Sequence, residues 1–481
     1  MLHRYPIWAA FLATTTSATP LAAVKRASSN GTGTIAQSFR DVPSSPDLNY
    51  TPCFNPNFTC ANLEVPLDYD NPDVGTTTIA FLKYESPKQP AKGDIIYNPG
   101  GPGGSPMEIM LPRIELLTMV LGDAYNIVGM DPRGVNNSGP NLDCFDGKPA
   151  IRDYYNGQAY DVNARSSESL DRYFEVSGGF GTWCSETLNQ SANYANTPAT
   201  ARDMLRYAEK LAESRGEPIE DAKVNYWGTS YGSTLGVTFA QLFPERVGRF
   251  MVDAVANAED HYFGRYAESI LQADKAVQAF FRYCAEAGPK CALFRNGTNS
   301  TANDIRQRVD AVLQDLEDNP IAVADPNAGI QFPVVVTHID LRSQMLLAMY
   351  SPTTSWPTLA VGIAQLEENR NATLLALASG KGIMPAAECD GISPEYNTVH
   401  SKLLIACNDN NKRAQVTTRE SLTALFKETR EVSTYVGDVW AAVIIPQCRN
   451  LKFAPPANQL LHSKLSPGLS IISATSQTLN Y

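Results

Sequence analysis

Short apolar runs alternate with helix-like segments along the first half of the chain. Runs of strand length end in Gly- or Pro-rich turns at "GDIIYNPGGPGG", "AYNIVGMDPRG" and "KVNYWG". Apolar residues recur at helical spacing in residues 106–121, in "PATARDMLRYAEKLAES" and in "STLGVTFAQLF". Strands that alternate with helices form a mostly parallel sheet covered on both faces, so the pattern predicts an α/β fold.

The pattern also predicts how the chain divides. "CANLEVPLDY" and "TTTIAFLKYES" indicate two paired strands, and "RVGRFMVDAV" indicates a further strand. Helical segments such as "AVQAFFRYCAEAG", "NDIRQRVDAVLQDLED" and "SLTALFKETREV" predominate afterwards, and a strand-like run returns only at "GLSIISATSQTLNY". We therefore expect a sheet core over residues 47–256, an inserted helical cap over 257–436, and a return to the core over 437–481.

The first residues have the layout of a secretory signal. A basic start, a short apolar stretch and small residues near Ala22 and Ala23 predict a signal peptide over residues 1–23, followed by a pro-segment or flexible linker over 24–46. The apolar stretch is too short for a membrane anchor. Lys25 and Arg26 resemble a dibasic processing site of fungal secreted proteins, although a basic pair at a flexible terminus is the simpler interpretation.

The cysteines and the asparagines of glycosylation sequons also favour the secretory pathway. The nine cysteines are scattered without the paired spacing of a zinc site, so disulfides are expected, including local Cys53–Cys60 and Cys284–Cys291 loops, with one thiol left over. Asn-x-Ser/Thr sequons could accept N-glycans, although chance supplies some of them. They begin at Asn30, Asn49, Asn57, Asn136, Asn189, Asn296, Asn299 and Asn371.

Charge excludes some partners. The formal net charge is −11 and no Lys/Arg cluster occurs, which argues against nucleic acid and against an anionic membrane surface. The sequence leaves the oligomeric state open.

The segment "GTSYG" supplies a candidate nucleophile. In a G-x-S-x-G motif that joins a strand to a helix, a sharp turn exposes the serine hydroxyl, here that of Ser230. The motif also occurs by chance in long chains. A second glycine-rich turn, "NPGGPGGSP", could bring backbone N–H groups close to a substrate carbonyl oxygen, or could be an ordinary turn. It carries no phosphate-binding fingerprint.

Four motifs in order carry a family resemblance. "YNPGGPGGSP", "GMDPRGVNNSGPNLDC", "NYWGTSYGSTLG" and "VDAV" resemble secreted α/β-hydrolases similar to the tripeptidyl aminopeptidases, a branch of the proline iminopeptidase-like serine peptidases. The match covers residues 50–260 well and the cap only loosely. The resemblance implies an α/β-hydrolase fold with a helical cap, no metal and no organic cofactor.

The resemblance also implies residue roles. Ser230 would be the nucleophile, and Gly100, Gly101 and Tyr231 would donate to the oxyanion. Asp131 and Arg133, from the D-P-R-G turn, would form a structural carboxylate–guanidinium pair beside the site.

The end of the chain departs from the family pattern. The expected position of the acid holds Gln477, and no later strand with a Gly-His pair follows, which predicts a hydrolase shortened at its C-terminus. His261, His338 and His400 fall in the cap, where structural roles are ordinary. His462 precedes the strand that should carry the acid, so its use, with Asp438 as a guessed partner, would require a rearranged triad.

Three functions follow from these observations. The first is a secreted serine hydrolase that releases short N-terminal peptides or residues through an acyl-enzyme at Ser230. The second is an esterase or tailoring hydrolase acting on a small metabolite. The third is a catalytically impaired binding protein, because loss of a triad base removes several orders of magnitude in rate.

Overall fold

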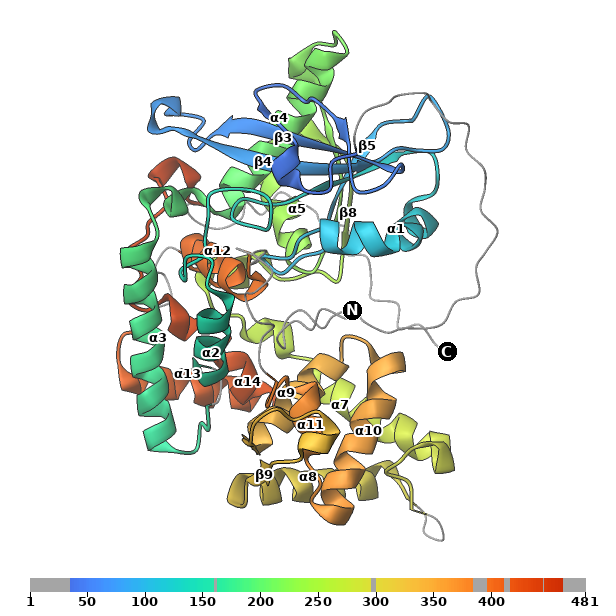
Figure 1. The fold of residues 1–481 in the computed structure, drawn as a ribbon, viewed down its shortest axis with the longest axis vertical. Helices are drawn as coiled ribbons and strands as arrows, with labels where there is room; N and C mark the ends of the chain where they lie inside the picture. The colour runs from blue at the N-terminus through green and yellow to red at the C-terminus, as the bar shows by residue number, and fades with distance from the viewer. Residues whose placement is uncertain are drawn as a thin grey trace.

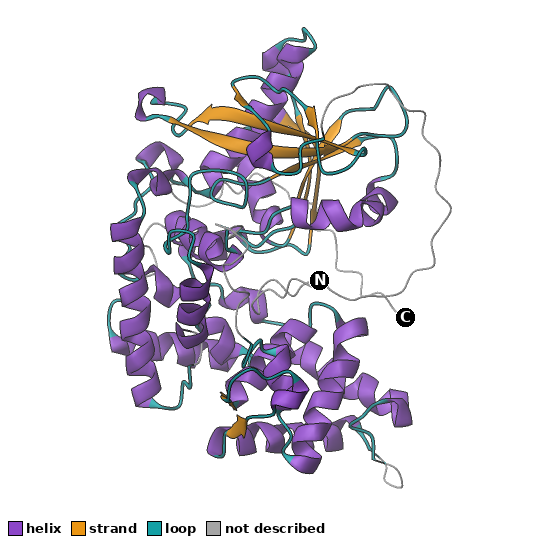
Figure 2. Ribbon diagram, viewed as in Figure 1, coloured by secondary structure: helices purple, strands orange, loops and turns teal. Residues whose placement is uncertain are grey.

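A twisted β-sheet forms one end of the molecule, and two groups of helices lie beside and below it in the view of Figure 1. Figure 2 shows that nearly all strands gather in this one layer. The computed structural model describes residues 35–159, 162–295, 300–383, 396–410, 416–443 and 445–461.

The sheet has the strand order β1-β3-β4-β6-β5-β7-β8, with β2 paired to β3. Strands β6, β5, β7 and β8 are mutually parallel, whereas β4 runs antiparallel to both β3 and β6. The strands are β1 (Ser44–Ser45), β2 (Thr51–Pro52), β3 (Phe58–Pro66), β4 (Thr76–Tyr84), β5 (Asp94–Asn98), β6 (Asn126–Met130), β7 (Val224–Thr229) and β8 (Val247–Asp253).

Both faces of the central strands are buried, because successive side chains of a strand point to opposite sides. Ile96 and Tyr226 pack on one face against helices α4 (Thr197–Ser214) and α5 (Tyr231–Leu242). Their neighbours Tyr97 and Trp227 pack on the other face against α1 (Met107–Leu121). This coverage explains why the central strands are mainly apolar and do not alternate regularly between apolar and polar residues.

The helices beyond the sheet form two packed groups. One contains α2 (Pro149–Ala159), α3 (Ser167–Thr187), α12 (Thr398–Asn410), α13 (Arg419–Val432) and α14 (Gly437–Ala441). The other contains α7 (Ala273–Ala287), α8 (Ala302–Asp318), α9 (His338–Ala348), α10 (Pro352–Asn369) and α11 (Thr373–Ala378), with the hairpin β9 (Ile321–Val323) and β10 (Val334–Val336). The short α6 (Ala258–Phe263) follows β8.

The expected strands and helices before residue 257 and the expected helices after it are confirmed. The long helix α3 was not anticipated. It packs with α12 and α13, which follow it by more than 200 residues in the sequence. The run "GLSIISATSQTLNY" lies outside the described residues, and the domain boundaries stay a prediction.

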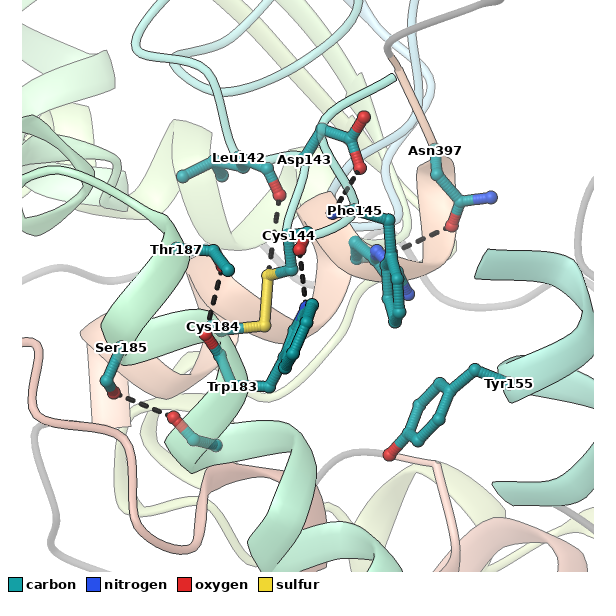
Figure 3. The surroundings of a disulfide bond; sticks show 12 residues. Leu142, Asp143, Cys144, Phe145, Tyr155, Trp183, Cys184, Ser185, Thr187 and Asn397 are labelled. Carbon is teal, nitrogen blue, oxygen red and sulfur yellow. Dashed lines mark hydrogen bonds between the residues drawn. A yellow bond between two sulfur atoms is a disulfide. The ribbon is translucent and has the colours of Figure 1, made fainter. Parts of the chain in front are cut away.

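Disulfides confirm the expected oxidised cysteines. The Cys53–Cys60 and Cys284–Cys291 bonds close the two local loops that were expected. The Cys144–Cys184 bond attaches a loop to α3, where Trp183 Nε1 also donates to the Cys144 carbonyl oxygen at 2.7 Å (Figure 3). The Cys407–Cys448 bond attaches α12 to a later segment. Cys389, the remaining cysteine, lies outside the described residues.

The expected pairing of Arg133 with Asp131 is wrong. Arg133 is fully buried and forms a bidentate pair with Asp203 of α4, with Nε–Oδ2 and Nη2–Oδ1 distances of 2.7 and 2.8 Å. Its remaining N–H groups donate to the carbonyl oxygens of Pro66, Leu67 and Tyr194. The pair therefore joins the loop after β6, the end of β3 and α4.

We expect Asp203→Asn to lower the free energy of unfolding by about 3 kcal/mol, because it leaves the buried Arg133 charge without its counterion. Equilibrium denaturation in urea measures the change. Asp171→Asn is the matched control: Asp171 pairs with Arg419 at 3.1 Å, but both side chains are 53% exposed, so a change below about 0.5 kcal/mol is expected. Equal losses in the two variants would contradict the expectation.

Candidate active site

Ser230 occupies a strained turn between β7 and α5. Its backbone has φ 57° and ψ −125°, a region that residues with a side chain rarely adopt. The turn is tight: a Cβ on Gly228 would lie 2.3 Å from the Gly232 carbonyl oxygen. The motif therefore forms the expected elbow, with the serine at its apex and exposed.

Backbone hydrogen bonds hold this elbow in place. The Ser230 N–H donates to the Asp253 carbonyl oxygen at the end of β8, at 3.0 Å. The Ser230 carbonyl oxygen accepts from the Ser233 N–H at 2.8 Å and from the Ser233 hydroxyl at 2.5 Å. Among the described residues, no hydrogen bond engages the Ser230 hydroxyl.

The second glycine-rich turn lies directly against the elbow. Gly100 has φ +99°, and a Cβ at this position would lie 2.8 Å from the Ser230 Cβ and 3.0 Å from the Tyr231 nitrogen. The Thr229 hydroxyl donates to the Pro99 carbonyl oxygen at 3.0 Å and holds the two turns together. The structure thus brings together the two motifs that the sequence separates by some 130 residues.

The amides of this region differ in their availability. The Gly100 N–H donates to the Asn98 side-chain oxygen at 2.9 Å, so it is already engaged. In the described part of the chain, the N–H groups of Gly101 and Tyr231 have no hydrogen-bond acceptor. Tyr231 is also the first residue of α5, where the helix dipole adds partial positive charge. These two amides are the better oxyanion candidates, and Gly100 supplies the close approach.

Asp131 is hydrogen-bonded to the end of the glycine turn. It is fully buried and accepts from the Ser105 hydroxyl at 2.5 Å, the Asn137 N–H at 3.1 Å and the Asn137 side-chain amide at 3.0 Å. Burial raises the pKa of Asp131 to about 7, although these hydrogen bonds lower it. Ser105 ends the glycine turn, so Asp131 lies beside the site as expected.

The described histidines lie elsewhere. His400 is buried, with Nε2 3.2 Å from the Asn156 side-chain oxygen, and burial lowers its pKa to about 3. His338 is buried at the start of α9. His261 is buried against Asp409, with 2.8 Å between Nε2 and Oδ2. None of the three is hydrogen-bonded to Ser230.

The rearranged triad gains no support from Asp438. That carboxylate pairs with Arg430 at 3.3 Å. His462 and Gln477 lie outside the described residues, so their roles stay predictions.

The expected glycosylation positions differ in exposure. Asn49, Asn57, Asn189 and Asn371 are exposed, whereas the Asn136 side-chain amide donates to Ser105 Oγ at 3.1 Å beside the glycine turn. Asn30, Asn296 and Asn299 lie outside the described residues.

Within the described ranges, no group of three His, Cys, Asp or Glu side chains could hold a metal ion. No helix in those ranges is long and apolar enough to cross a membrane.

Comparison with known proteins agrees with this geometry. The family model described as "alpha/beta hydrolase fold" matches residues 95–294, a range that contains both glycine turns and Ser230. The protein has the α/β-hydrolase fold and is a serine hydrolase.

Curated relatives refine the comparison. Serine protease Hip1 of Mycobacterium tuberculosis (strain ATCC 25618 / H37Rv) is 26% identical over 436 residues, which cover 88% of this chain and 78% of the relative. Tripeptidyl aminopeptidase of Streptomyces lividans is 31% identical over 207 residues, covering 41% of this chain and 35% of the relative. Carboxylesterase B of Mycobacterium tuberculosis (strain CDC 1551 / Oshkosh) is 28% identical over 334 residues, which cover 66% of this chain and 57% of the relative.

We expect Gly100→Ala to abolish labelling of Ser230 by a fluorophosphonate probe, because the added methyl group would collide with the Ser230 Cβ in a backbone conformation that alanine disfavours. The rate of labelling is followed by gel fluorescence. Gly179→Ala is the control, since its Cβ would meet no atom within 4 Å and should leave the rate unchanged. Unaltered labelling in Gly100→Ala would contradict the proposed contact.

We expect Asp131 to make folding stability depend on pH between about 4 and 7. Its pKa is higher in the folded state, so its contribution is complete below about pH 4 and disappears as pH rises through about 7. The slope difference between wild type and Asp131→Asn should reach at most about 1.4 kcal/mol per pH unit. Urea denaturation at several pH values measures it, and parallel profiles would show that the expectation is wrong.

Proposed function

We propose that this serine hydrolase is a secreted peptidase that releases short peptides or residues from substrate N-termini, with Ser230 as nucleophile. The observation that carries the proposal is the juxtaposition of an exposed serine on a strained elbow with a glycine turn whose Gly101 N–H has no acceptor among the described residues. The names of the Mycobacterium and Streptomyces relatives support peptide substrates. Four disulfides support an oxidising compartment.

The proposed chemistry is acyl transfer. The Ser230 oxygen attacks the scissile carbonyl carbon and gives up its proton to a base, while the carbonyl oxygen becomes an oxyanion that accepts from the Gly101 and Tyr231 amides. Collapse of this intermediate breaks the C–N bond, the amine leaves with a proton, and an ester to Ser230 remains. Water then attacks the ester and releases the peptide acid. No described histidine is assigned as the base, and use of His462 as the base would require the rearranged triad.

Ester hydrolysis is the second candidate function. The similarity to carboxylesterase B, over 66% of this chain, favours it specifically. The elbow and the oxyanion amides serve both reactions equally, because both pass through the same type of tetrahedral intermediate. Only the leaving group and the surroundings of the acyl group distinguish the two substrate classes.

The test compares three substrates on the purified chain: a tripeptide aminocoumarin with a free N-terminus, its N-acetylated form, and a nitrophenyl ester. We expect the free tripeptide to be cleaved with the highest kcat/KM and Ser230→Ala to lower that value at least about 10³-fold. Ser214→Ala, an exposed serine at the end of α4, is the control and should match wild type.

The other outcomes separate the alternatives. Turnover of the ester alone would establish the esterase function in place of the peptidase. No turnover of any substrate, together with equal fluorophosphonate labelling of wild type and Ser230→Ala, would overturn catalysis at Ser230 and favour a binding protein.

A further inference from the structure

The side chain of Tyr231 belongs to a buried network of hydrogen-bonded polar side chains. Its ring is buried, and its hydroxyl is hydrogen-bonded to Thr197 Oγ1 at the first residue of α4. Thr197 contacts Asp409 of α12, with Oγ1–Oδ2 and N–Oδ1 distances of 2.5 and 2.8 Å. His261 of α6 closes the network on Asp409 Oδ2 at 2.8 Å, and its ring centroid lies 5.3 Å from that of Tyr231.

The chemistry of these groups fixes the direction of each hydrogen bond. The Asp409 side chain is fully buried, and its carboxyl oxygen Oδ2 accepts a hydrogen bond from the Thr197 hydroxyl. The Thr197 oxygen must then accept from the Tyr231 hydroxyl, which burial and the Asp409 charge keep protonated by raising the tyrosine pKa. His261 donates through Nε2 and can accept at Nδ1 from the Tyr266 hydroxyl, 3.3 Å away.

The same helix, α12, also supports the glycine turn. A Cβ on Gly103 would lie 2.6 Å from the Lys402 nitrogen and 2.8 Å from the Thr398 carbonyl oxygen, so this part of the turn lies on the α12 backbone. Just before α12, the Tyr396 hydroxyl donates to the Gly103 carbonyl oxygen. One end of α12 therefore supports the turn of Gly101, and the other end holds the side chain of Tyr231.

Further contacts fix α12 to neighbouring segments of the chain. The Ser401 hydroxyl donates to the Gly134 carbonyl oxygen at 2.6 Å. The Asn408 side-chain amide donates to the carbonyl oxygens of Ala192 and Ala195 at 2.8 and 2.9 Å. The Cys407–Cys448 disulfide lies next to Asn408. Because α12 contacts both the glycine turn and the network of Tyr231, it fixes the two donor turns relative to each other.

We propose that Thr197, Asp409 and His261 are positioning residues that fix Tyr231, and with it the oxyanion amide next to Ser230. The inference rests on the proposed acyl-transfer function. A buried carboxylate that accepts several hydrogen bonds adds no more to folding stability than apolar packing would. It does, however, hold its hydrogen-bond donors in one geometry. Oxyanion stabilisation requires such a geometry, because a donor contributes only when it points at the place where the charge develops.

The test removes one hydroxyl. Tyr231→Phe keeps the ring but breaks the first bond of the network, and we expect kcat to fall about tenfold, a fraction of the loss caused by deleting an oxyanion donor. KM should change less than about twofold, and a peptide trifluoromethyl ketone, which forms a tetrahedral adduct, should bind about tenfold more weakly. Tyr173→Phe is the matched control: its buried hydroxyl donates to the Ala442 carbonyl oxygen at 2.7 Å, away from the elbow, so kcat should not change.

A second pair of variants keeps the test decisive if Tyr231→Phe folds poorly. Thr197→Val breaks the network and should show the same kcat loss, whereas Thr197→Ser restores the hydroxyl and should recover most of it. Melting temperatures identify losses that come from unfolding.

The outcomes are distinguishable. An unchanged kcat in folded Tyr231→Phe or Thr197→Val, with wild type active and Ser230→Ala inactive, would overturn the positioning role alone. Equal kcat losses in Tyr231→Phe and Tyr173→Phe would also overturn it. Wild-type activity equal to that of Ser230→Ala would overturn the proposed function and the inference with it.

Discussion

The close approach of Gly100 to Ser230 is the contact on which the site depends. A nucleophile on a strained elbow needs a neighbouring turn near enough to present amides to the carbonyl that it attacks, and here the available distance leaves no room for a Cβ. The parallel arrangement of β5 and β7 makes this possible, because the carboxyl ends of adjacent parallel strands deliver both turns to the same edge of the sheet. The backbone of β8 then holds the elbow through Asp253.

Local sequence was sufficient for much of the fold. Strands such as Asp94–Asn98 and Val224–Thr229 are short, mainly apolar runs that lead into glycine-containing turns, so their positions could be read directly. The elbow was equally visible, because its conformation depends on glycines within two residues of Ser230. The oxyanion roles proposed for Tyr231 and Gly101 came from the family resemblance and stay predictions.

Long-range partners could not be read in this way. Arg133 was expected to pair with Asp131, two residues away, yet its guanidinium reaches Asp203, 70 positions further along the chain. His261 and Asp409 are 148 positions apart, and nothing in their spacing distinguishes them from other cap residues. Such pairs arise from the packing of α6 and α12 against α4, which hydrophobic periodicity does not encode.

The attachments of α12 have a consequence for how the molecule can move. By sequence position this helix belongs to the cap, but the hydrogen bonds of Ser401, Asn408 and Asp409 join it to segments that precede the nucleophile strand. In mechanical terms it is part of the rigid body that carries Ser230. Any motion that opens the way to Ser230 must therefore leave α12 in place, because moving this helix would break its hydrogen bonds to Gly134, Ala192 and Thr197.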